Sequence, residues 1–178
     1  MEFRSFELNP NANPQEQSTL EEALARKYGM SLEQAHALNA RVVAAAAGEG
    51  LQYRLDIARR GNTFDAHRLI HLAAGEGKQE GMKERLMAAY FLEGRAIGDP
   101  DTLVELATEV GIEPERARAA LDSDEFAEAV RADEREATEL GIAGVPFFVI
   151  NRRYGVSGAQ PPEVMLKALV AGWEDREA

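Results

Sequence analysis

The stretch GIAGVPFFVINRRYGVSG, residues 141–158, determines how the fold of this chain is interpreted. Pro146 directly precedes an apolar run, FFVI, that is typical of a buried strand, and the half-polar run YGVSG indicates a second strand. The polar residues between the two runs predict a turn, and therefore an antiparallel hairpin. Because Gly-Val precedes the proline and an apolar run follows it, a cis Val145–Pro146 bond is favoured over an ordinary proline on an edge strand.

The sequence before the hairpin predicts one short strand followed by a long helical block. FRSFEL, residues 3–8, alternates apolar and polar side chains as a half-buried strand does. Beyond it, helical spacing of apolar residues is divided by capping residues and glycines. The predicted helix starts are Ser18, Ser31, Asp99-Pro100, Ser123 and Pro161-Pro162, and the helix that starts at Ser123 is expected to end at Leu140.

The composition is that of a globular protein with an acidic surface: 45% of the residues are hydrophobic and the formal net charge is -11. This charge disfavours nucleic acid and anionic membranes as partners. No apolar run has transmembrane length and no signal-peptide pattern is present, so we expect a cytoplasmic protein. The 178 residues contain no cysteine, which excludes a disulfide, a thiolate nucleophile or a cysteine-ligated metal within them.

Four segments carry a resemblance to a known family: FRSFELNPNA, GNTFDAHRLIHLA, MAAYFLEG and GVPFFVINRRYGVSGAQPPEVML. In this order, over nearly the whole chain, they resemble the FrnE-like branch of the DsbA family of thiol–disulfide oxidoreductases. The resemblance implies an incomplete thioredoxin-like fold of mixed α and β class that is mostly helical. It assigns residues 1–14 and 141–178 to the thioredoxin-like part and residues 15–140 to an inserted helical domain.

The resemblance also implies where a substrate would bind. In thioredoxin-like proteins, the residue before the cis-proline lies beside the dithiol, and a substrate chain pairs with its backbone like an added strand. The segment NTFDAHRL lies on a helix that faces the redox site in that family. The candidate substrate-binding residues are therefore Gly144, Val145, Pro146, Asn62, His67 and Arg68. No residue of this chain is assigned a catalytic role.

Other chemistries are less well supported by the residues. His67 and His71 are four residues apart on a predicted helix, which permits a metal pair, but HRLIH lacks the Glu of an HExxH motif and no third ligand is evident. We therefore interpret them as hydrogen-bonding residues and expect no metal and no cofactor. Ser157 has no base and acid to activate it and is interpreted as part of a turn.

The family pattern begins with a strand and a Cys-Pro-x-Cys motif at a helix start, where the helix N-terminus favours the thiolate. This sequence contains neither. Three explanations stay open: a fragment or a gene product with a late start, a degenerate member with a binding or structural role, or a chain whose missing strand comes from another polypeptide. Because a gap in a sheet leaves backbone groups without partners, we expect a rearranged sheet, a homo-oligomer or marginal stability.

Three functions are therefore considered. The first is a DsbA-type oxidoreductase that acts on protein or peptide thiols and is inactive as this chain. The second is a glutathione-linked enzyme of the kappa-type transferase and 2-hydroxychromene-2-carboxylate isomerase branch, which uses a serine in place of the first cysteine. The third is a non-catalytic peptide-binding module. The segments NTFDAHRL and SGAQP favour the first.

Overall fold

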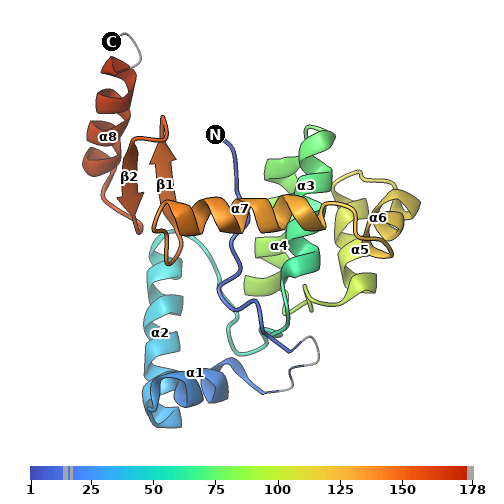
Figure 1. Ribbon diagram of the computed structural model, residues 1–178. Helices are drawn as coiled ribbons and strands as arrows, with labels where there is room; N and C mark the ends of the chain where they lie inside the picture. Colours follow the sequence, from blue (N-terminus) through green and yellow to red (C-terminus); the bar gives the residue numbers. More distant parts are fainter. Residues whose placement is uncertain (14–15, 17, 176–178) are drawn as a thin grey trace. The chain divides into compact units, whose positions relative to one another are not determined.

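A computed structural model of the chain describes residues 1–13, 16 and 18–175 (Figure 1). It divides into two units, Met1–Arg131 and Ala132–Ala178, and each is described by itself. The predicted domain boundary at residues 14 and 15 lies outside the described residues. The helices and strands are α1 (Leu20–Tyr28), α2 (Leu32–Gly48), α3 (Phe64–Gly75), α4 (Gln79–Phe91), α5 (Pro100–Glu109), α6 (Pro114–Leu121), α7 (Ala127–Glu139), β1 (Phe147–Ile150), β2 (Tyr154–Ser157) and α8 (Pro162–Glu174).

Helices α3 to α6 pack around the hydrophobic core of the first unit. Each presents apolar residues at helical spacing to its neighbours, and burying one large side chain stabilises the fold by roughly 1.5–3 kcal/mol. The core holds α3, the helix that carries the candidate residues His67 and Arg68. The largest fully buried side chains of this core are Leu69, Met82, Leu103, Leu106 and Ile112.

The helix starts follow the capping signals, with one shift. The Oγ of Ser31 accepts a hydrogen bond from the backbone N–H of Gln34 at 3.1 Å, which confirms the predicted cap of α2. At α1 the capping residue is Thr19, one residue after the predicted Ser18, because Thr19 and Glu22 form the reciprocal capping box. Ser18 has another partner: its hydroxyl accepts a hydrogen bond from Arg60 at 3.0 Å.

Helix α7 begins at Ala127, four residues later than the sequence predicted. Phe126 has a φ of +62°, a left-handed conformation that interrupts a right-handed helix, and its side chain packs against the hydrophobic core. Ser123 closes the preceding helix, since its hydroxyl donates to the carbonyl of Ala119 at 2.9 Å. The predicted start at Ser123 is therefore wrong: this residue lies in the loop after α6, hydrogen-bonded to the last turn of that helix, and does not begin α7.

Residues 3–8 do not form the predicted strand. A strand needs a hydrogen-bonding neighbour, and in the described part of the chain β1 and β2 pair only with each other. Side chains take the place of a neighbouring strand here. The amide of Gln79 accepts from the N–H of Phe3 at 3.2 Å and donates to the carbonyl of Phe3 at 3.0 Å. The Gln79 side chain thus fixes the segment to α4, because it pairs with both backbone groups of Phe3.

The second unit contains the predicted antiparallel hairpin, in which Phe147 lies opposite Ser157 and Ile150 opposite Tyr154. Its turn uses left-handed backbone at Asn151 and Arg152, with φ values of +52° and +56°. Helix α8 packs on the hairpin, and the hydroxyl of Tyr154 donates to Asp175 at 2.7 Å. This hydrogen bond raises the pKa of Tyr154, because it stabilises the protonated hydroxyl.

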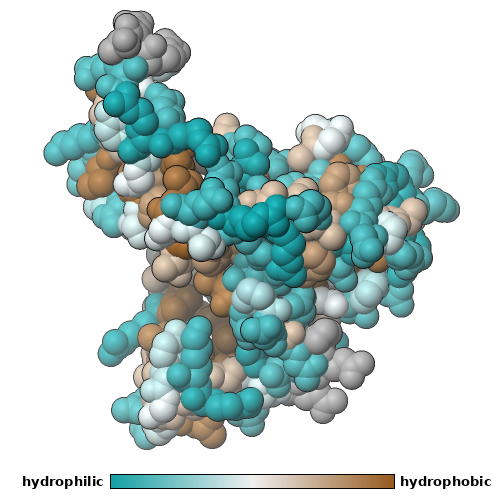
Figure 2. All heavy atoms as spheres, in the orientation of Figure 1, coloured by the Kyte–Doolittle hydropathy of each residue, from teal (hydrophilic) through white to brown (hydrophobic). Residues whose placement is uncertain are grey.

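The face shown in Figure 2 carries much hydrophilic surface, in keeping with the 29% of charged residues, with apolar patches between. Several large apolar side chains of α2 and α8 are nevertheless exposed. None of the described helices combines the length and the hydropathy needed to cross a membrane.

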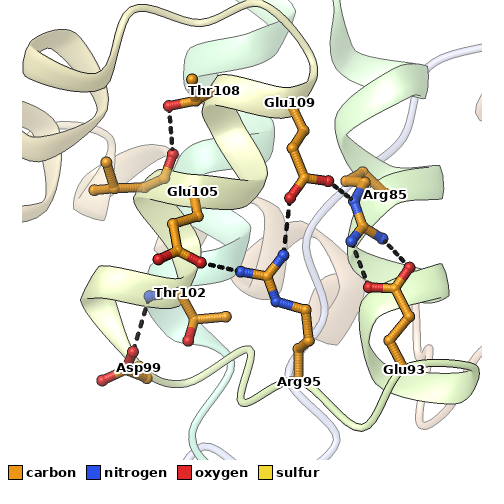
Figure 3. A network of polar contacts seen from close by, with 9 residues as sticks. Arg85, Glu93, Arg95, Asp99, Thr102, Glu105, Thr108 and Glu109 are labelled. Carbon is orange, nitrogen blue, oxygen red and sulfur yellow. Dashed lines mark hydrogen bonds and ion pairs between the residues drawn. The ribbon is translucent and has the colours of Figure 1, made fainter.

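Charged side chains connect α4, α5 and the loop between them (Figure 3). Arg85 donates to Glu93 at 2.9 Å and also to Glu109. Arg95 donates to Glu109 at 2.8 Å and also to Glu105. The hydrogen bond from Arg85 lowers the pKa of Glu109, because the folded state favours its carboxylate form. Since several charges share partners, this network is expected to contribute more than an isolated surface pair.

We expect Glu109→Gln to lower the free energy of unfolding by about 1 kcal/mol at neutral pH. A carboxylate whose pKa is lowered by folding stabilises the protein above its unfolded pKa, and this contribution is lost as the pH falls through the folded pKa. The difference from the parent protein should therefore disappear well below pH 4.5, the ordinary value for this carboxyl. Urea unfolding between pH 3 and pH 7 tests this, with Glu139→Gln as the matched exposed control. A difference that stays constant with pH would contradict it.

Gly172 is the point of closest approach between α8 and β1. A Cβ placed on Gly172 would lie 2.5 Å from Cγ2 of Ile150. We expect Gly172→Ala to lower the free energy of unfolding by about 1–3 kcal/mol through overpacking, and Ile150→Ala to relieve part of this loss in the double variant. The fluorescence of Trp173, the only tryptophan, reports unfolding of the second unit.

Gly81 in α4 serves as the control, because a Cβ there meets no atom within 4 Å. Gly81→Ala should stabilise the protein by about 0.5–1 kcal/mol, since alanine favours the helix. Equal effects of the two alanine substitutions would contradict the packing argument.

Candidate functional site

Asn62 fixes the start of α3. Its Oδ1 accepts from the N–H of Phe64 at 2.8 Å, and its Nδ2 donates to the carbonyl of Pro10 at 3.2 Å. A Cβ on Gly98 would lie 2.8 Å from the carbonyl oxygen of Asn62, so the loop before α5 also approaches closely. Asn62 therefore joins the N-terminal segment to the helix that carries the other candidates of the first unit.

Arg68 is buried in the first unit, with a side chain that is 5% exposed. Four of the oxygens that accept from it are backbone carbonyls at the end of α6 and in the loop that follows, where helical carbonyls lack partners. A cation is also favoured at a helix C-terminus. Its five N–H donors are directed at the carbonyls of Ala120, Leu121, Ser123 and Glu125 and at the carboxylate of Asp65.

This arrangement gives Arg68 a structural role and not the cleft-lining position expected from the sequence. All five donors of the guanidinium already face protein acceptors, so none is left for a substrate. The sequence does not reveal this role, because the carbonyls that accept from Arg68 lie more than fifty residues further along the chain.

The two histidines of α3 have separate environments. His67 is half-buried, and His71, one turn later, lies with its Nε2 3.1 Å from the Oγ of Ser5. This contact joins α3 to the segment of residues 3–8. Among the described residues, no group of three histidine, aspartate or glutamate side chains is arranged to hold a metal ion.

A further cluster at the start of α3 was not identified from the sequence. Arg131 donates to Glu7 at 2.7 Å, and the Glu7 side chain is fully buried. The guanidinium of Arg131 also lies 4.2 Å from the centroid of the Phe64 ring, a cation–π contact. No local pattern could reveal this pair, because Glu7 and Arg131 are 124 residues apart.

Gly144, Val145 and Pro146 lie in the second unit, directly before β1. The Val145–Pro146 peptide bond is cis, the isomer that the sequence favoured. Val145 is 49% exposed. The carbonyl of Pro146 accepts from the N–H of Gly158 at 2.8 Å, so the hairpin ladder continues one residue beyond β1.

This ladder determines which backbone groups are free to meet a partner. In an antiparallel pair, alternate residues direct their N–H and C=O groups toward the neighbouring strand. Because Pro146 pairs in this way with Gly158, the alternation turns the backbone groups of Phe147 and Val149 away from β2. Val145 lies two residues before Phe147, on the other side of the cis bond. Within the described residues, no strand pairs with this outer edge of β1.

The candidate residues thus fall into two groups. Asn62, His67 and Arg68 belong to Met1–Arg131, and Gly144, Val145 and Pro146 belong to Ala132–Ala178. Each group is described within its own unit. The first group contains two half-buried polar residues, Asn62 and His67, and the buried Arg68. The second group precedes β1, whose outer edge pairs with no other described strand.

Comparisons with known proteins agree with this geometry. The model of the DSBA-like thioredoxin domain matches residues 1–170. The crystal structure of a probable DsbA oxidoreductase from Streptomyces coelicolor superposes on 96% of this chain with a TM-score of 0.88 and 46% sequence identity, and this chain covers 74% of that chain. The predicted thioredoxin-like fold with a large helical part is thereby confirmed.

One curated relative is more distant. The uncharacterized protein YwbO of Bacillus subtilis (strain 168) is 32% identical over 101 residues, which are 56% of this chain. The match spans half the length of the Bacillus protein.

We expect Arg68→Ala to lower the free energy of unfolding by about 3 kcal/mol, because it leaves buried carbonyls without donors. Arg68→Lys should cost nearly as much, since an ammonium cannot direct five donors in a planar fork. Urea unfolding monitored by circular dichroism measures both. Arg59→Ala, at an exposed position, is the control and should change stability by less than about 0.5 kcal/mol. A neutral Arg68→Lys would contradict the role proposed for the guanidinium.

Proposed function

The chain belongs to the family of the DSBA-like thioredoxin domain, and from this membership we propose that it provides the substrate-binding part of an FrnE-like protein disulfide oxidoreductase. The observation that carries the proposal is the outer edge of β1, which pairs with no other described strand and follows the exposed Val145, in a chain that matches the family over residues 1–170. We propose residues 1–14 and 141–178 as the thioredoxin-like part, and residues 15–140 as a helical insertion. The substrate would be a protein or peptide thiol or disulfide in the cytoplasm.

The chemistry of this family needs two thiols. One thiolate attacks a disulfide sulfur and forms a mixed disulfide while the other substrate sulfur leaves as a thiol. A second thiol then resolves the mixed disulfide and becomes oxidised. The 178 residues contain no cysteine, so this chain performs neither step by itself. What it retains is the capacity to bind the substrate chain.

Backbone pairing supports binding at Val145. An extended peptide gains main-chain hydrogen bonds when it adds to an open strand edge, and alternate side chains then meet the surface. Val145 is an exposed residue shortly before the outer edge of β1. Gly144 leaves room beside it, because a Cβ at Gly144 would meet no atom within 4 Å.

Residues of α3 are proposed to contribute to substrate selection. His67 and Asn62 are half-buried polar residues near the start of this helix. Arg68 supports them indirectly, since it anchors the end of α6 to α3. A pair of polar residues on a helix held by a hydrophobic core suits the recognition of a peptide side chain.

We expect the chain to bind an unfolded, carboxymethylated insulin B chain saturably and to show no dithiothreitol-driven reduction of insulin. Val145→Pro should weaken peptide binding at least tenfold, because it removes the backbone N–H that pairs with the peptide. Val145→Ala is the matched control: it keeps the peptide group and should bind nearly as the parent does. Isothermal titration calorimetry measures these affinities, and circular dichroism confirms that each variant is folded.

Thiol-dependent turnover by the chain alone would refute the inactive assignment. Absence of peptide binding, or equal binding by Val145→Pro and Val145→Ala, would refute the binding edge. Saturable binding of glutathione without peptide binding would instead favour the glutathione-linked branch.

A further inference from the structure

Helices α1 and α2 form a hairpin that packs against no other helix or strand of the described chain. On its inner side α2 buries Ala35, Asn39 and Ala46. At 100° per residue, the α2 residues that line a hollow of about 320 Å³ are centred roughly 130° around the helix from this buried side, with Leu38 nearest to it. They are Gln34, Ala37, Leu38 and Arg41, and Met30, which precedes the helix, also lines the hollow.

This outer face of α2, defined by the five lining residues and by Glu33 at its border, is apolar at its centre. Leu38 is 38% exposed and adjoins Ala37, a small residue beside the hollow. Figure 2 shows apolar surface over α2. A projecting leucine beside a hollow on the same helix is the pattern that allows two such helices to interlock.

Charge is unusually sparse along this helix. Between Gln34 and Gly48 the only residue charged at neutral pH is Arg41, whereas the whole chain carries a net charge of -11. Two copies of an acidic protein repel each other, and this repulsion is weakest where acidic side chains are absent. Electrostatic repulsion between two copies is therefore expected to be weak at the outer face of α2.

The two charges at the ends of this face are self-complementary. Glu33 and Arg41 have opposite signs and are eight residues apart, or about 12 Å along the axis. Neither makes an ion pair with any residue in the described ranges. In an antiparallel pair of identical helices centred on Ala37, residue 33 of one copy lies opposite residue 41 of the other.

We propose that the outer face of α2 is a homodimer interface in which two copies pack antiparallel about a two-fold axis at Ala37. Leu38 of each copy packs against Leu38 of the other beside this axis. Arg41 of each copy pairs with Glu33 of the other, which gives two equivalent ion pairs. Such a surface is isologous: each copy contributes the same residues, as closed two-fold dimers require. The proposal does not depend on the proposed function.

The arrangement of charges supplies a direct test. Arg41→Glu and Glu33→Arg each place like charges opposite one another, so each should raise the dimer dissociation constant at least tenfold. The double variant Glu33→Arg/Arg41→Glu exchanges the signs and should restore dimerisation. Analytical ultracentrifugation over a range of concentrations measures the constants. Arg59→Glu and Glu139→Arg make the same changes in net charge at other exposed positions and should leave the dimer nearly unchanged.

Chemical crosslinking provides a second readout, because no native cysteine competes. Ala37→Cys should crosslink to a covalent dimer with a short bismaleimide. Ala47→Cys, on another side of α2 and also exposed, should not. A protein that stays monomeric throughout would overturn the proposal. So would a dimer that the single charge reversals leave intact, or one that the double variant fails to restore.

Discussion

The need of every strand to have a hydrogen-bonding neighbour governs this structure. In the described residues β1 pairs with β2 alone, and no strand reaches the outer edge of β1. The segment of residues 3–8, which has the alternation of a strand, has no strand to pair with and is held by side chains. Gln79 supplies both a donor and an acceptor to the backbone of Phe3, as a neighbouring strand would. The small sheet and the irregular N-terminal segment are thus two results of one constraint.

Elements that depend on interactions between nearby residues could be predicted from the sequence. The hairpin, the start of α2 at Ser31 and the start of α5 at Asp99 each depend on residues a few positions apart. The strand at residues 3–8 was wrong because alternation reports which side chains are suited to burial, and cannot report whether a neighbouring strand exists. The start of α7 was wrong because core packing holds Phe126 in a left-handed conformation that no cap signal announces.

The same distinction between local and long-range interactions applies to the candidate site. Gly144, Val145 and Pro146 could be placed from sequence because the motif and the strand it precedes are contiguous. The structural role of Arg68 could not be predicted, since four of its partners are carbonyls of a different helix and of the loop after it. When an arginine follows a histidine on an amphipathic helix, the local sequence does not show whether the arginine is buried or lines a cleft. Only the long-range contacts distinguish a residue that shapes the site from one that touches a substrate.

Helix α8 extends this reasoning to the second unit. It packs on the hairpin through Gly172, yet it also exposes a row of large apolar side chains at helical spacing. A helix that is apolar on more than one side is typical of a buried helix, and a hairpin of two strands is only marginally stable alone. The exposed row consists of Leu166, Leu169, Val170 and Trp173.

Within the described residues of the second unit, the outer edge of β1 pairs with no strand, and α8 exposes its apolar row. Any polypeptide that binds there is favoured both by backbone pairing and by apolar burial, and its binding also stabilises the unit because only the folded state presents both surfaces. A ligand of either surface would therefore raise the stability of this unit.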